Sequence, residues 1–133
     1  MTQAIIFTND TGGVSVCIPT GEISIEAVLA KDCPSGAIII NVADLPQAND
    51  FFDAWELADE AVTVSLAKAK EITKKRLRAE RAPLLEIQDL AFQRAQESDS
   101  DTTAIVAEKN RLRDVTKLAD LETTLEGLRS IKV

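Results

Sequence analysis

The chain has 133 residues, of which 45% are apolar, and this size and composition are typical of one globular domain. Its net charge of −7 argues against nucleic-acid binding and against adhesion to anionic membranes, since both need a surplus of Lys and Arg. Histidine and tyrosine are absent, which excludes the usual general base and every His-dependent triad. The N-terminus does not resemble a signal peptide and no window has the length of a membrane span, so we expect a soluble cytoplasmic protein.

The first sixty residues predict short β-strands. The β-branched runs 4–8 and 14–18 are separated by Asn-Asp-Thr-Gly-Gly, which favours a tight turn and therefore a hairpin. Ser24 is a suitable N-cap for a short helix that ends near residue 32. Residues 37–42 are expected to form a third strand.

Residues 51–57, FFDAWEL, contain three of the five aromatic residues: Phe51, Phe52 and Trp55. We expect a second hairpin here, with Val62 and Val64 after a polar turn; a helix over 51–59 is the alternative. Two interpretations of the aromatic side chains stay open, burial in the β-rich part and exposure as an anchor for a partner. Trp55 is expected to pack where the β-rich and helical parts meet. Phe51 and Phe52 point to opposite sides if the segment is extended.

From residue 65 onward the apolar period changes to that of a helix. Leu66, Ala69, Ile72 and Leu77 form a thin apolar stripe, and a more apolar stretch follows Pro83. This proline is expected to end, kink or restart the helix, because it lacks a backbone donor and clashes with the preceding turn.

Residues 98–103 are a polar connection to a second helix over 104–115. Asp120 is expected to cap a last short helix. The sequence therefore predicts an α+β fold, with a β-rich head over 1–64 and an antiparallel helical hairpin over 65–133, together forming one compact unit.

Lys74, Arg78 and Arg81 lie at helical spacing in a basic segment that Glu71 and Glu80 interrupt. A solvated helix face and a surface for an acidic protein partner are the two main interpretations. Together with Phe51, Phe52 and Trp55, these three residues are our candidate partner-binding residues. A second basic cluster, over 111–116, is expected to be structural, with Asp114 pairing locally.

Cys17 and Cys33 have no metal-ligand spacing. Two reduced thiols are the favoured interpretation, and a disulfide or a reactive thiol are the alternatives. No phosphate-binding loop or metal cluster is present, so the sequence predicts neither a cofactor nor an enzymatic activity.

Four segments in a fixed order resemble small proteins encoded beside the tail-fibre genes of tailed bacteriophages, which include tail-fibre assembly proteins. The segments are AKDCPSG (30–36), LPQANDFFDAWEL (45–57), KAKEITKKRLRAERAPLL (68–85) and KNRLRDVT (109–116), the last preceded by Asp89 and Arg94–Ala95. The chain departs from the pattern after residue 116, where a proline is expected.

The resemblance implies a non-enzymatic accessory protein that binds a tail-fibre or tail protein, either as an assembly chaperone in the host cytoplasm or as a minor structural component of the virion tail. A homo-oligomer is compatible with either role. The alternative function is a phage-encoded regulator that binds a host protein.

Overall fold

The computed structural model describes residues 2–133, so Met1, the first residue of the predicted head, lies outside the described residues. The chain divides into two compact units: unit 1 runs up to Lys68, and unit 2 runs from Ala69 to Val133. Strands occupy unit 1 and long helices occupy unit 2, which confirms the predicted α+β fold class.

Unit 1 contains a three-stranded antiparallel sheet with β1 (Gln3–Thr8) in its centre, between β2 (Val14–Cys17) and β3 (Ile38–Asn41). The predicted first hairpin and third strand are therefore confirmed. Asn9 closes the β1–β2 turn, since its Oδ1 accepts hydrogen bonds from the backbone amides of Thr11 and Gly13, each at 3.1 Å. Gly12 adopts a φ of 83°, a conformation that favours glycine.

Alternation along the strands gives this sheet two apolar faces. On one face Ile6 and Val14 pack against Trp55 in a buried cluster. The neighbouring Ile5, also fully buried, points to the opposite face. Helix α1 (Ile25–Asp32) contacts β1 and β3 and buries Val28. The predicted cap of α1 is confirmed, because the Ser24 hydroxyl accepts a hydrogen bond from the Ala27 amide at 3.2 Å.

The second hairpin pairs β4 (Trp55–Ala58) with β5 (Ala61–Val64), as the preferred interpretation predicts. Asp59 and Glu60 form its turn with φ values of 50° and 66°. Before β4 the chain forms a single 3-10 turn at Phe52–Ala54 (η2), and another such turn, Val42–Asp44 (η1), follows β3. Residues 51 and 52 are thus not extended, so the expectation that Phe51 and Phe52 alternate as in a strand does not apply.

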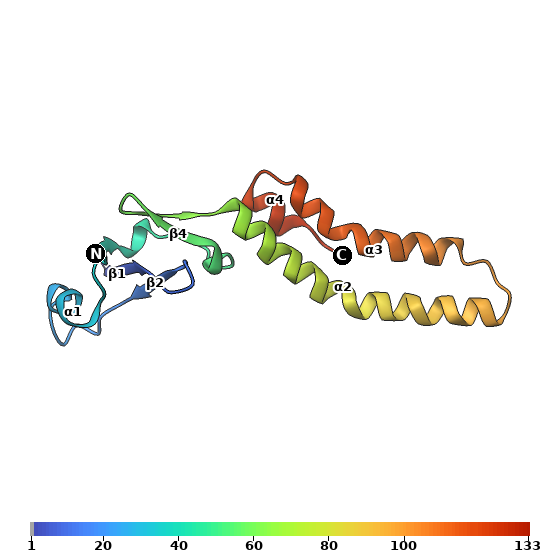
Figure 1. Ribbon diagram of the computed structural model, residues 1–133, viewed down its shortest axis with the longest axis horizontal. Helices are drawn as coiled ribbons and strands as arrows, with labels where there is room; N and C mark the ends of the chain where they lie inside the picture. Colours follow the sequence, from blue (N-terminus) through green and yellow to red (C-terminus); the bar gives the residue numbers. More distant parts are fainter. Residues whose placement is uncertain (1) are drawn as a thin grey trace. The chain divides into compact units, whose positions relative to one another are not determined.

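Unit 2 is a helical hairpin in which α2 (Leu66–Glu97) and α3 (Thr103–Leu121) run antiparallel, followed by α4 (Leu125–Ser130) (Figure 1). Its buried side chains lie near the start of α2 and the end of α3, where α4 also lies. They are Ala69, Thr73, Leu77, Leu112, Val115, Ala119, Leu128 and Ile131. Unit 2 therefore has its dry core at one end of the hairpin.

Pro83 neither ends nor restarts α2, which is a single helix of 32 residues with this proline inside it. Figure 1 shows α2 changing direction in its middle, where the colour passes from green to yellow. A proline inside a helix leaves the carbonyl four residues earlier without its donor, which accounts for a bend. Of the three predicted outcomes, the kink is the one that the fold adopts.

Asp120 does not cap the last helix, and that prediction is wrong. Helix α3 continues to Leu121, so Asp120 lies inside it. The N-cap of α4 is Thr124, whose hydroxyl accepts a hydrogen bond from the Gly127 amide at 3.0 Å.

Candidate functional site

Phe51, Phe52 and Trp55, the aromatic candidates, all belong to unit 1. Phe51 and Trp55 are 5% and 4% exposed, whereas Phe52 is 37% exposed. The rings of Phe52 and Trp55 are in contact, with centroids 4.8 Å apart and planes tilted by 56°. Trp55 packs in the core of unit 1 on Ile6 and Val14, so of the three only Phe52 presents its ring to solvent.

A surface hollow of about 460 Å³ lies beside Phe52 in unit 1. It is lined by Asn9, Thr11, Gly13, Val14, Phe52, Asp53 and Lys68. The Asn9 side chain is already used, because it holds the β1–β2 turn and donates to the Ser15 hydroxyl at 3.2 Å. The charged groups of the lining are the Asp53 carboxylate and the Lys68 ammonium, which do not make a convergent catalytic set.

Lys74 and Arg81, two of the three basic candidates on α2, bind within the helical hairpin. The Lys74 ammonium lies 2.6 Å from the Asp120 carboxylate of α3. The Arg81 guanidinium donates to the backbone carbonyls of Leu112 and Arg113, also on α3, at 3.2 and 2.8 Å. These two residues therefore hold the hairpin together.

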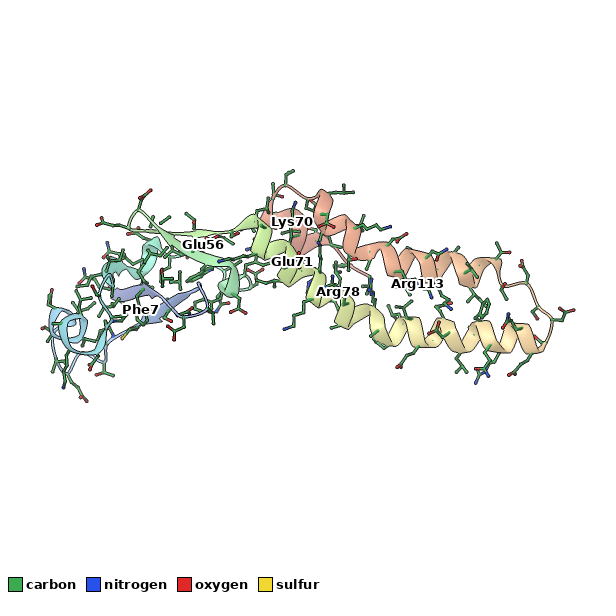
Figure 2. The ribbon with its side chains drawn as sticks, viewed as in Figure 1. Phe7, Glu56, Lys70, Glu71, Arg78 and Arg113 are labelled. Carbon is green, nitrogen blue, oxygen red and sulfur yellow. The ribbon has the colours of Figure 1, made fainter. Side chains whose placement is uncertain are left out.

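Arg78 differs from its two basic neighbours because its side chain is exposed. Figure 2 labels it on α2, together with Arg113 on α3. Within residues 2–133, neither Arg78 nor the adjacent exposed Lys75 has a hydrogen bond or an ion pair. Arg78 is thus the basic candidate that is available to a partner.

Arg76 has a structural role that the sequence did not reveal. Its guanidinium donates to the carbonyl oxygens of Leu128 and Ile131, at 3.2 and 3.0 Å, at the C-terminal end of α4. Carbonyls at the end of a helix lack intrahelical donors, so a cationic donor there stabilises the end of α4. The sequence carried a signal only for the local pair with Glu80, four residues away, at 2.9 Å.

The part of the hairpin remote from this core, residues 78–111, is here called the distal hairpin. No described residue in this range has a buried side chain. Within it, the side chain of Lys109 on α3 contacts α2. Its ammonium lies 2.7 Å from the Asp89 carboxylate and 4.9 Å from the centroid of the Phe92 ring. The distal hairpin therefore has helical structure without a dry interior.

Large apolar side chains are exposed on the distal hairpin. Ile87 and Leu90 on α2 are 59% and 48% exposed, and Val106 on α3 is 39% exposed. Ile87, Leu90 and Arg94 follow the i, i+3, i+7 spacing that places residues on one helix face. Arg78 precedes Ile87 by nine residues, which is about two and a half turns, so it lies on the opposite side of α2.

The ionisable groups bear on what chemistry the chain can perform. Hydrogen bonds with neighbours on the chain are the main cause that lowers the pKa of Asp101 and Glu108 and raises the pKa of Arg111. Among residues 2–133, no three His, Cys, Asp or Glu side chains gather as a possible metal site. Over the same range, no helix has the length and apolar character that crossing a membrane requires.

The chain matches no protein-family model, no curated protein and no solved structure, so its resemblance to tail-fibre-associated proteins stays a hypothesis.

Proposed function

We propose that this chain is a non-enzymatic accessory protein of a tailed bacteriophage that binds a tail-fibre or tail protein through its distal hairpin. The observation that carries the binding proposal is the exposure of Ile87 and Leu90 in a segment with no buried side chain. The phage context comes from the resemblance of the sequence segments alone.

The distal hairpin has the features of a helix that binds in a groove. Such helices anchor apolar side chains at i, i+3 and i+7 spacing, and arginine is enriched among residues that dominate interface energetics. Ile87 and Leu90 supply the apolar anchors, and Arg94, exposed on the same face, supplies a cationic end. The partner surface that complements this face is an apolar groove with a carboxylate at one end.

Phe52 and Arg78 are the two sequence candidates that remain available for binding. Phe52 is exposed in unit 1, and Arg78 lies on the side of α2 opposite Ile87. We assign them to secondary contacts, because neither lies on the face formed by Ile87, Leu90 and Arg94. Phe51, Trp55, Lys74 and Arg81 are engaged inside the two units and are not proposed as binding residues.

The test is a binding titration of the purified chain against each purified fibre and tail protein encoded in the same genome. We expect one of them to bind. The double variant Ile87→Asp, Leu90→Asp should bind at least about 100-fold more weakly, because each buried aliphatic side chain contributes about 1.5–3 kcal/mol. Circular dichroism and sedimentation of the variant report whether its helices and its oligomeric state are preserved.

Ile18→Asp is the matched control, because Ile18 is also 59% exposed but lies in unit 1. It should bind as the parent chain does. The proposal is wrong if no fibre or tail protein binds, or if the control weakens binding as much as the double variant. Capture of a single defined host protein, lost in the double variant, would instead support the regulator function.

Mass spectrometry of purified virions separates the two forms of the proposed role. A chaperone acts in the host cytoplasm during assembly and is absent from finished particles. A virion component is present in a fixed ratio to the fibre or tail subunits, set by their symmetry.

A further inference from the structure

The two cysteines lie on the same side of the three-stranded sheet. Cys17 ends β2 and pairs with Ile5 of β1. Because side chains alternate along a strand, Cys17 points away from the face on which Val16 packs against the Trp55 cluster. It shares the opposite face with Ile5, and α1 contacts β1 and β3.

Cys33 lies on this side of the sheet at the C-terminal end of α1. It is the C-cap of α1, directly before Pro34, where the chain turns towards β3. Both cysteines are free and half-buried. The strand register and the helix end thus place on one side of the sheet two thiols that are sixteen positions apart in the sequence.

The ionisation of Cys33 is consistent with this proximity. Burial raises the pKa of its thiol, and the charges of Cys17 and Asp32 and a hydrogen bond with Cys17 raise it further. A thiol near a mixed disulfide on a second cysteine can attack it and form an internal disulfide.

We propose that Cys17 and Cys33 form a reversible intramolecular disulfide, which makes them a thiol-oxidation site whose co-reactant is a low-molecular-weight disulfide. The thiolate of one cysteine attacks a sulfur of the oxidant, whose S–S bond breaks and releases one small thiol. The thiolate of the second cysteine then attacks the mixed disulfide and releases the second small thiol. Two cysteine thiols are oxidised, and one small disulfide is reduced to two small thiols that carry the two protons.

The bond would close the loop over residues 17–33. This loop includes the apolar residues Ile18 and Ile23, which are 59% and 49% exposed. Cross-linking its ends removes conformations from the unfolded chain, so the oxidised form is expected to resist denaturation better than the reduced form. The inference does not depend on the proposed binding function, because the two thiols belong to unit 1.

The test exposes the reduced full chain to oxidised glutathione, alkylates the remaining thiols and measures the intact mass. We expect a monomer that has lost two hydrogen atoms and carries neither alkyl groups nor glutathione. A reducing agent should restore two alkylatable thiols. Denaturant titration of the two forms should give the higher midpoint for the oxidised one.

Cys17→Ser and Cys33→Ser are the matched controls, and each should carry one glutathione or one alkyl group and no internal bond. A parent chain that stays fully alkylatable, that carries two glutathiones, or that forms only disulfide-linked dimers contradicts the proposal. An oxidised monomer with an unchanged denaturation midpoint would overturn the loop-closure argument.

Discussion

The Lys74 ammonium lies 2.6 Å from the Asp120 carboxylate and joins α2 to the last turn of α3. The backbone carbonyl of Asp120 accepts a second hydrogen bond, from the Lys70 ammonium at 3.0 Å. Two cations therefore meet the C-terminal end of α3, where the helix dipole favours positive charge. This arrangement explains why the Asp120 side chain is not free to cap α4.

Asp120→Asn is expected to lower the pKa of Lys74 and the stability of unit 2. The hydrogen bond with Asp120 is the main cause that raises the pKa of Lys74 above its ordinary value, and burial opposes it. Because the folded pKa is raised, the stabilisation is present below the unfolded pKa and is lost as the pH rises through the folded pKa. The difference in denaturation midpoint between parent and variant should therefore be present at neutral pH and vanish at strongly alkaline pH.

NMR titration of the Lys74 side chain measures the pKa directly. Asp114→Asn is the matched control, because Asp114 forms an ion pair with the exposed Lys117 three residues away, at 3.0 Å, and not with Lys74. It should leave the pKa of Lys74 unchanged. An unshifted pKa in Asp120→Asn would contradict the role given to this ion pair.

Trp55→Ala is expected to destabilise unit 1 by about 3–5 kcal/mol, the usual effect of removing a buried tryptophan. Trp55→Phe should cost clearly less. The buried indole Nε1 of Trp55 has no hydrogen-bond partner within the described residues, so its removal breaks no hydrogen bond. Denaturant unfolding followed by circular dichroism compares the variants without relying on tryptophan fluorescence.

Phe52→Ala is the control for these variants, since the Phe52 ring touches Trp55 but is partly exposed. We expect it to cost about 1 kcal/mol, the size of an aromatic pair contribution. Equal losses in Trp55→Phe and Trp55→Ala would contradict the view that Trp55 stabilises unit 1 mainly through the packing of its ring.

Pro83→Ala is expected to stabilise the hairpin by up to about 3 kcal/mol, the cost of proline relative to alanine inside a helix. The alanine amide restores the donor that the carbonyl of Ala79 lacks. Thermal unfolding of the parent and the variant measures the gain, and paramagnetic distance measurements along α2 report whether the bend is lost.

Pro34→Ala supplies a control of opposite sign. Pro34 is exposed and lies outside any helix, directly after α1. Its replacement should destabilise the chain by about 0.4–1 kcal/mol, because the unfolded chain gains freedom. A Pro83→Ala variant that is less stable than the parent would mean that the bend itself is needed for packing.

Asp101 is expected to stabilise the start of α3 in a pH-dependent way. Its Oδ1 accepts hydrogen bonds from the Thr103 hydroxyl at 2.7 Å and from the Thr103 amide at 3.0 Å. These bonds, the hydroxyl one first, lower the pKa of the Asp101 carboxyl. Because the folded pKa is depressed, the stabilisation is present above the unfolded pKa and is lost as the pH falls through the folded pKa, below about pH 4.

Asp101→Asn keeps an oxygen acceptor but cannot ionise, so it separates the charge from the geometry. The difference in denaturation midpoint between the parent chain and this variant should shrink as the pH falls from neutral to below about 4. A difference that stays constant over this range would exclude a contribution from ionised Asp101.

Local sequence patterns predict the secondary structure of this protein in most places. Alternating β-branched runs around Asn9 and Gly12 predict the first hairpin, because turn chemistry and strand period act over only a few residues. Ser24 predicts the start of α1 for the same reason. Helical spacing places Ile87 and Leu90 on one face of α2, but it favours closing that face inside the hairpin, and only the structure shows that both side chains are exposed.

Which side chains are available to a partner depends on how the folded chain packs. Phe51 and Phe52 are equivalent in the sequence, and the 3-10 turn before β4 buries the first and exposes the second. Lys74, Arg78 and Arg81 share one pattern on α2, yet two of them bind α3 and one does not. Burial and hydrogen bonding between segments depend on how elements pack across long stretches of chain, and helical spacing carries no information about which acceptor lies opposite a given donor.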